Sequence, residues 1–349
     1  HFGQAGRSFG EHALRYARLG AEAAMARCAY ERAVHLYTQA LRQLGELGRG
    51  DDGERLVLAR GLADAQQRAG LLREARAGYE QILVEARRRN EPRLLAGTAL
   101  ALAYPVPEIG RSDPELAELL EEGARTIAGE DPALRSRLCS RLAMELWPVD
   151  YPRAAALAKE AIELARKSED PRALAYAYYA RFGGEIDVDL AEAAREMLLV
   201  GEKAGDKELI AEARVQRLRL FIGDGDPARA EGELDALSRL AADSHQPRHL
   251  WIAHLCRTSW LISRGHLAEG ERFAQETAAL GARAQEPNTD QVLASQIGVI
   301  LYLRGHAAEV RPYLETLVAE RPDFLAWRAA LAYCCVETED LAGARATLD

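Results

Sequence analysis

Two copies of the sequence Arg-Gly-His-x-Ala-Glu, beginning at Arg264 and Arg304, carry side chains that could do chemistry. In each copy a histidine precedes a glutamate by three residues, and such a pair can bind a metal ion or transfer a proton. The alternative is architectural, because glycine suits a tight turn and an acidic residue is stabilised in the first turn of a helix. The copies start forty residues apart, so in a stack of repeats they would lie about 10 Å apart and would not readily share one ion. We therefore expect each copy to form the turn between two helices.

The rest of the sequence lacks the motifs that mark common active sites. It contains no Gly-Lys dipeptide, and hence no phosphate-binding P-loop, and neither H-E-x-x-H nor G-x-S-x-G occurs. The nearest approach to a histidine cluster is His245, His249 and His254, but Pro247 intervenes. The last two histidines are five residues apart and would not share a helix face, so we expect helix-start and surface histidines. The sequence predicts no catalytic residue, no metal site and no cofactor.

The bulk composition narrows the class of protein. The 349 residues carry a net charge of −9, which argues against a general nucleic-acid-binding surface. No apolar run approaches the roughly 18 residues of a membrane span, and the five cysteines include no C-x-x-C motif. We expect a cytoplasmic protein that binds neither nucleic acid nor membrane. The chain begins at His1, without methionine, and we expect it to be part of a longer protein.

Residues 58–83 show the pattern that repeats along the chain. Ala63 is the small residue of a first predicted helix, Gly70 is the turn, and Ala75 and Tyr79 line one face of a second helix. Small side chains let two antiparallel helices approach closely, and an aromatic ring one turn later fills the wedge beside them. This pattern resembles the tetratricopeptide repeat, a helical hairpin of about 34 residues.

The close-approach position recurs along the whole chain. We place it at Ala33, Ala75, Ala117, Ala154, Ala193, Ala230, Gly270, Val310 and Ala344, which are 34 to 42 residues apart. The third unit fits least well, because Pro105 and Pro107 interrupt it. We predict an all-α fold, a right-handed superhelix of about nine tetratricopeptide-like hairpins that forms a single α-solenoid over residues 1–349.

Several positions on the first helices of the hairpins are candidates for ligand binding on the concave face. They are Trp147, Tyr178, Phe182, Arg219, Ser259 and Tyr302. Aromatic rings provide contact area at low entropic cost, and arginine provides a forked set of donors, so these residues suit an extended peptide or a sugar-like molecule. The alternative is that the aromatic residues belong to the core between repeats.

The N-terminal segment has a more specific resemblance. Residues 1–44 resemble the junction that follows the ATPase module in bacterial multidomain signalling ATPases, namely STAND or LuxR-type regulators and the related cyclase- or kinase-linked ATPases. The features that carry this resemblance are His1-Phe2, Ala5-Gly6, Tyr16-Ala17 and the block AYERAVHLYTQAL at 29–41. The resemblance implies that residues 1–47 form the first hairpin, placed directly after an ATPase. It also implies that the superhelix binds an inducer or a partner and thereby controls the ATPase switch.

These observations lead to one functional hypothesis and two alternatives. The chain is predicted to be the non-enzymatic sensor and interaction region of a signal-transduction ATPase or transcriptional regulator. Its partners would be a protein or peptide, its own upstream ATPase domain, or a small-molecule inducer. One alternative is a free-standing adaptor that holds peptide segments of partner proteins, and the other is an all-α enzyme whose histidines and acidic residues converge across repeats.

Overall fold

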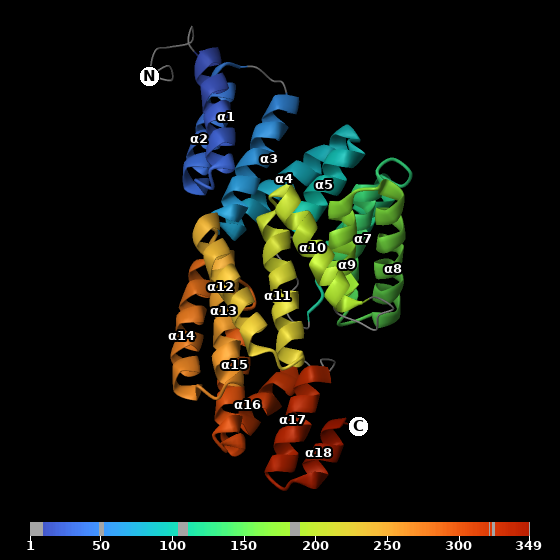
Figure 1. The fold of residues 1–349 in the computed structure, drawn as a ribbon. Helices are drawn as coiled ribbons and strands as arrows, with labels where there is room; N and C mark the ends of the chain where they lie inside the picture. Colours follow the sequence, from blue (N-terminus) through green and yellow to red (C-terminus); the bar gives the residue numbers. More distant parts are fainter. Residues whose placement is uncertain are drawn as a thin grey trace.

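A computed structural model describes residues 10–48, 52–103, 111–181, 189–320, 322 and 325–348. Within these ranges the chain forms eighteen α-helices and no strand (Figure 1). The first helices of successive hairpins are α1 (Gly10–Ala26), α3 (Asp52–Arg68), α5 (Pro92–Leu102), α7 (Pro132–Leu146), α9 (Pro171–Arg181), α11 (Lys207–Gly223), α13 (Pro247–Ser263), α15 (Thr289–Leu303) and α17 (Leu325–Glu337). The second helices are α2 (Tyr30–Glu46), α4 (Leu72–Arg89), α6 (Pro114–Thr126), α8 (Tyr151–Ser168), α10 (Leu190–Ala204), α12 (Pro227–Ser244), α14 (Leu267–Arg283), α16 (Ala307–Glu320) and α18 (Leu341–Leu348).

The predicted repeat register is confirmed. Every predicted close-approach residue is the fourth residue of a second helix, and Ala33, Ala154 and Ala230 are fully buried. Ala117 and Val310 are only half-buried. Each helix packs against the next along the chain, so a hairpin buries its apolar face by stacking on its neighbours. The predicted all-α superhelix of tetratricopeptide-like hairpins is therefore correct.

The two Arg-Gly-His copies form turns, as predicted. Gly265 and Gly305 have φ angles of +80° and +81°, in the left-handed region that glycine adopts without strain. Each following histidine donates its backbone N–H to a carbonyl five residues earlier, over 2.9 Å in both copies. His306 also contacts Glu309, with 2.7 Å between Nδ1 and Oε1, but both side chains are at least half exposed. In the described ranges, no group of three or more histidine, cysteine or acidic side chains is placed to hold a metal ion.

Aspartates begin several helices and explain where the hairpins start. Asp113, Asp131 and Asp226 each accept a hydrogen bond from the backbone N–H three residues on, and a proline follows each of them. Such a cap satisfies a donor that the helix itself leaves unpaired, which contributes about 1 kcal/mol, and proline has no N–H to satisfy there.

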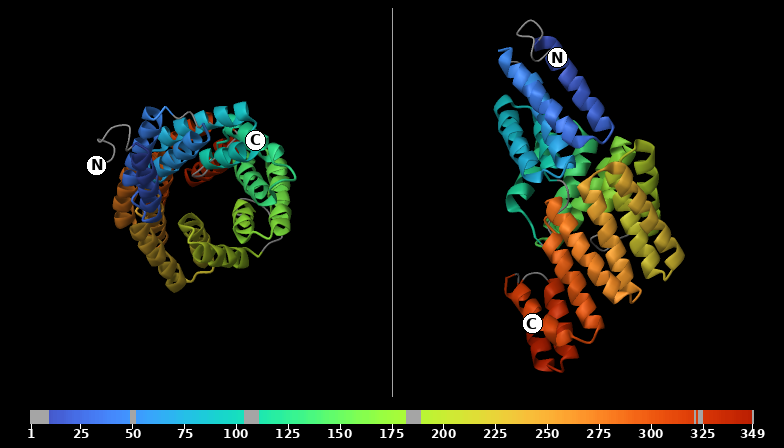
Figure 2. Two further views of the ribbon diagram at one scale, coloured as in Figure 1. Left: turned by 90° about the horizontal axis from the view of Figure 1, so that it is seen from above. Right: turned by 90° about the vertical axis from the view of Figure 1, so that its left-hand side faces the viewer.

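The superhelix makes more than one full turn, so that segments far apart in the sequence meet. Viewed from above, the helices form a ring, and α12 to α14 lie beneath α1 to α4 (Figure 2). We call this junction the seam. Across it the Gln246 side chain donates to the Tyr30 hydroxyl over 3.4 Å, and the Arg73 backbone N–H donates to Gln285 Oε1 over 3.3 Å. Lys207 Nζ also lies 3.4 Å from the sulfur of Cys28.

Candidate functional site

A large cavity lies at the seam, where the two turns of the superhelix face each other. Its volume is about 720 Å³, which is within the range of sites for small ligands and peptide segments. The first turn contributes Arg73 and Arg76 of α4 and Arg141 of α7, and the second turn contributes Gln285 and Glu286 from the connection between α14 and α15. The walls therefore belong to both turns, and they are rich in hydrogen-bonding groups.

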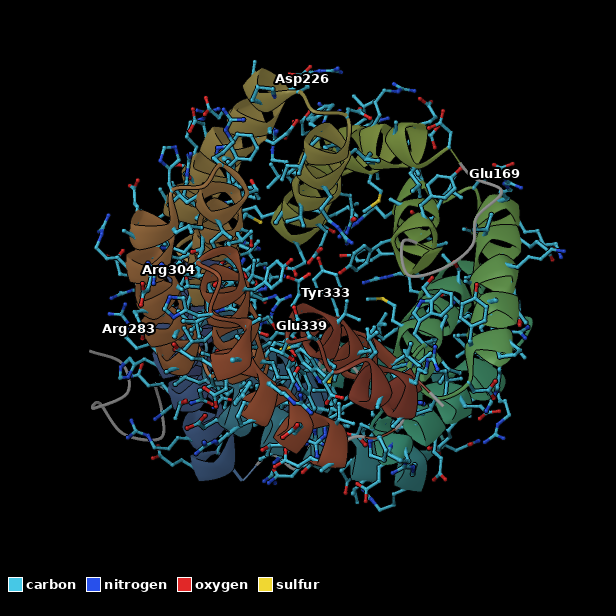
Figure 3. The ribbon with its side chains drawn as sticks, turned by 90° about the horizontal axis from the view of Figure 1, so that it is seen from below. Glu169, Asp226, Arg283, Arg304, Tyr333 and Glu339 are labelled. Atoms are coloured by element: carbon cyan, nitrogen blue, oxygen red, sulfur yellow. The ribbon has the colours of Figure 1, made fainter. Side chains whose placement is uncertain are left out.

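A smaller cavity of about 100 Å³ adjoins the first one. It lies among α5, α7, α9 and α11, and Ala103 and Arg141 line both cavities. Its other walls combine apolar, basic, acidic and phenolic side chains. These are Leu100, Met144, Arg137, Ser140, Tyr176, Tyr179, Glu208 and Glu212. Figure 3 shows side chains from the ring of helices that point toward the centre of the superhelix.

The buried ion pair of Arg141 and Glu145 lies between the cavities and is satisfied within the chain. Arg141 Nε donates to the Ala103 carbonyl over 2.8 Å, and Nη1 donates to Glu145 Oε2 over 2.7 Å. The other oxygen of Glu145 accepts the backbone N–H of Asp113 over 2.7 Å. Because Asp113 also caps α6, this pair ties α7 to the end of α5 and the start of α6.

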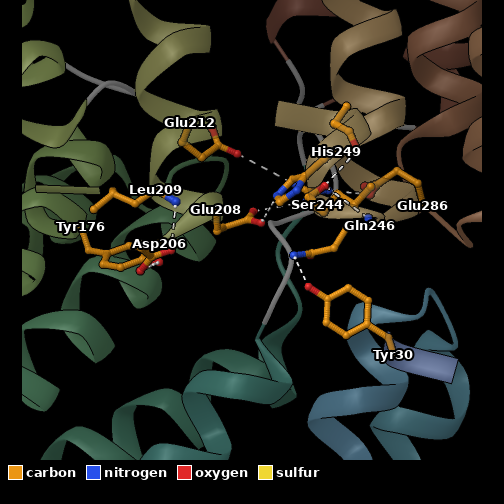
Figure 4. A network of polar contacts seen from close by, with 12 residues as sticks. Tyr30, Tyr176, Asp206, Glu208, Leu209, Glu212, Ser244, Gln246, His249 and Glu286 are labelled. Carbon is orange, nitrogen blue, oxygen red and sulfur yellow. Dashed lines mark hydrogen bonds and ion pairs between the residues drawn. The ribbon is translucent and has the colours of Figure 1, made fainter. Parts of the chain in front are cut away.

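A second polar group is centred on Arg248 at the start of α13, and we call it the Arg248 cluster. Glu208 and Glu212 of α11 and Glu286 after α14 converge on this guanidinium (Figure 4), at distances of 3.4, 3.8 and 2.5 Å. The His249 ring contacts Glu208 with 3.0 Å between Nε2 and Oε2. Three carboxylates thus share one guanidinium and one imidazole in a mostly buried position. His249 lies at the start of α13, as expected, but its side chain is only 1% exposed and is not at the surface.

Glu212 is the member of the Arg248 cluster with the most perturbed ionisation. Burial raises the pKa of its carboxyl to about 7, although the nearby Arg248 charge acts in the opposite direction. The ordinary value of 4.5 applies to the unfolded chain. Since the pKa is higher in the folded state, the protonated Glu212 contributes stability that is fully present below about pH 4.5. That contribution is lost as the pH rises to about 7.

Glu212→Gln is therefore expected to remove this pH dependence. Glutamine keeps the size of the side chain and cannot ionise, so the variant should be about 1–2 kcal/mol more stable than the parent at pH 8. At pH 4.5 the two proteins should be nearly equally stable, because the parent carboxyl is then protonated. Urea unfolding at both pH values measures the difference. Equal stabilities at pH 8 would show that Glu212 ionises without cost.

The predicted concave-face residues do not come together in either cavity. Trp147 and Tyr178 are half-buried and pack against the hydrophobic core, in line with the core alternative. The indole N–H of Trp147 donates to the Ala180 carbonyl over 3.3 Å. Phe182 lies outside the described residues.

The other three candidates lie farther along the superhelix. Arg219 is exposed on α11, and Ser259 on α13 accepts a hydrogen bond from Gln296 over 3.2 Å. The Tyr302 and Tyr333 hydroxyls are 2.7 Å apart, and Figure 3 places Tyr333 near the centre of the ring. None of these three residues lines either cavity.

Comparisons with known proteins bear on the fold. No family model matches the chain, and no curated protein is similar to it in sequence. Among solved structures, the chain is similar to a Signal Transduction ATPase with Numerous Domains (STAND) protein with a tetratricopeptide repeat sensor from Pyrococcus horikoshii. The TM-score is 0.50 and the identity 13%, over 91% of this chain and 50% of that one. This chain thus spans half the length of that protein.

A second similar structure is that of a Rap protein complexed with competence and sporulation factor. The TM-score is 0.36 and the identity 14%, over 86% of this chain and 77% of that one.

No described helix is long and apolar enough to cross a membrane. Taken with the repeat register, the comparison with the STAND protein shows that this chain has the fold of a tetratricopeptide-repeat solenoid.

Proposed function

We propose that this chain is the non-enzymatic sensor and interaction region of a signal-transduction regulator, and that its ligand or partner binds inside the superhelix. The observation that carries the proposal is the large cavity at the seam, whose walls come from both turns. Charged side chains are costly to bury, so a polar interior is a feature that stacking of the hairpins does not require. The N-terminal resemblance to the junction after a signalling ATPase favours a regulator whose switch lies upstream.

The seam offers a way to transmit binding. Its contacts include single hydrogen bonds between Tyr30 and Gln246 and between Arg73 and Gln285, each worth only about 1 kcal/mol net, and the contact of Lys207 with Cys28. A ligand in the large cavity would touch both turns, so its affinity would differ between a closed and an opened seam. Differential affinity of this kind is what shifts an equilibrium between two states. A peptide, an inducer or the upstream ATPase domain would each act in this way.

The test is a thermal-shift screen followed by hydrogen exchange. A ligand at about 100 times its Kd should stabilise the chain by about 2.7 kcal/mol. Peptides, sugars and amino acids are the first panel. Each ligand that raises the melting temperature is then expected to slow exchange at residues 28–30, 70–73, 246–249 and 284–286, which form the seam. Ligands that protect only α15 to α18 would contradict a sensor built on the seam.

That contrary result would favour an adaptor that binds peptides along the second half of the array. The observations behind this alternative are the exposed side chains of Arg219 and Ser259 and the hydrogen-bonded pair of Tyr302 and Tyr333. The two rings are tilted at 52° to each other with their centroids 5.4 Å apart, which gives a surface with aromatic and hydroxyl groups. Arg219→Ala is expected to weaken an anionic peptide bound there and to leave a ligand in the seam cavity unaffected.

A further inference from the structure

The smaller cavity contains two opposite charges that do not compensate each other. Arg137 lies on α7 and Glu212 on α11, and both line the cavity. The guanidinium of Arg137 lies over the Tyr176 ring at 4.9 Å. It has no carboxylate partner within 4.0 Å in the described part of the chain, and its buried Nε has no hydrogen-bond acceptor. The side chain of Arg137 is half-buried, and a guanidinium with a buried Nε and no anion is not an arrangement that stacking of the helices requires.

Glu212 has a negative charge that nearby cations compensate only in part. It receives a hydrogen bond from the Tyr179 hydroxyl, and its nearest cation is Arg248 at 3.8 Å. That guanidinium lies closer to Glu208 and Glu286, so Glu212 has the weakest share of its charge. A cation placed in the cavity beside Glu212 would complete its compensation.

The remaining walls limit the size and shape of what fits. Leu100, Ala103 and Met144 provide an apolar surface, and the Ser140 hydroxyl, which donates to the Ser136 carbonyl, can still accept a hydrogen bond. Arg141 uses Nε and Nη1 in its bonds to Ala103 and Glu145. The volume of about 100 Å³ is smaller than the roughly 150 Å³ of an engineered cavity that holds benzene, which leaves no room for a large side chain.

We infer that this cavity is a binding site for a free α-amino acid with a short side chain, such as glycine, alanine or serine. The carboxylate pairs with Arg137, the ammonium pairs with Glu212, and the side chain lies against Leu100 and Met144. A simple anion would satisfy only Arg137, and a simple cation only Glu212. A zwitterion satisfies both without changing the net charge of the interior. This inference rests on the proposed function, because it names the ligand class of the same interior.

The experiment is isothermal titration of the full chain at pH 8 with glycine, L-alanine and L-serine. Two analogues of alanine each lack one charge: alaninamide has no carboxylate, and N-acetylalanine has no ammonium. Each should bind at least about tenfold more weakly than alanine, because each loses one charged hydrogen-bonded pair. Leucine and phenylalanine should not bind, since their side chains exceed the cavity. Equal affinity for alanine and alaninamide, or no binding of all three small amino acids, would overturn the inference.

Variants assign the two charges to their residues. Arg137→Gln is expected to weaken alanine by at least about tenfold and Glu212→Gln by a similar factor, while Arg137→Lys should retain part of the affinity. Arg195→Gln, on the neighbouring helix α10 with an exposed side chain that lines neither cavity, is the control and should leave binding unchanged. Circular dichroism of each variant verifies that it is folded, and the analogue series on the parent protein is independent of folding. Full affinity in a folded Arg137→Gln would overturn the assignment.

The outcomes also separate this inference from the proposed function. If amino acids do not bind but another ligand protects the seam, the sensor proposal stands and the ligand class is wrong. If alanine binds with the predicted dependence on Arg137 and Glu212 but hydrogen exchange at the seam is unchanged, the binding site is correct. The proposal that binding acts through the seam is then wrong.

Discussion

Arg248→Met is expected to destabilise the folded chain by about 3–5 kcal/mol at pH 8. Arg248 is the nearest guanidinium to three acidic side chains, with distances of 2.5 Å to Glu286, 3.4 Å to Glu208 and 3.8 Å to Glu212. Methionine fills a similar volume but leaves these carboxylates without their shared counter-ion. Burial of uncompensated charge, rather than loss of packing, then determines the effect. Urea unfolding followed by circular dichroism measures it.

The pH dependence distinguishes this cause from a packing defect. In the variant the three carboxylates lose their shared counter-ion, so protonation should restore stability as the pH is lowered. The defect is therefore expected to shrink markedly between pH 8 and pH 5. Arg257→Met is the matched control, because it lies on the same helix but pairs with a largely exposed Asp235, an interaction worth 0–1 kcal/mol. A defect of the same size at both pH values would mean that Arg248 acts through packing.

The fold was predictable because the same pattern of small residues and turns recurs along the sequence. A small residue at the fourth position of each second helix sets how closely the hairpin closes, and Ala33, Ala154 and Ala230 occupy this position fully buried. The turn residues Gly265 and Gly305 have the positive φ angles that the repeated motif required. These signals are local, since each depends on residues within one hairpin, and one hairpin largely determines the next.

The site was much less predictable, because it depends on which turn of the superhelix meets which. Gln285 contacts Arg73 although the two residues are 212 positions apart in the sequence. No pattern within one repeat indicates that contact. Arg137 and Arg248 were missed because arginine is common on the exposed faces of these helices. One usable signal was present at the start of α13, where Arg248 and His249 directly precede a run that includes Trp251. Charged residues embedded in an apolar first helix are candidates for an interior site, since that helix faces inward.

The repeat register itself predicts a large effect at Ala154. Ala154→Trp is expected to cost about 3 kcal/mol or more and to lower both the melting temperature and the helix content. Ala154 is fully buried. It belongs to the core that contains Leu142 and Leu146 of the paired helix α7. An indole there must force α7 and α8 apart, and neither cavity borders the residue to receive the ring.

Ala156→Trp is the matched control, because it lies two residues along the same helix with its side chain exposed. It has the same effect on helix propensity but meets no packed neighbour, so its melting temperature should stay close to that of the parent. The difference in melting temperature between these two variants tests how closely α7 and α8 pack in this hairpin. If Ala154→Trp melted with Ala156→Trp, the small side chain would not be what lets the helices approach, and the spacing of the whole array would need another cause. If it melted far below, the same spacing would account for the curvature that brings residues 28–30 and 246–249 together at the seam, and thus for the interior site.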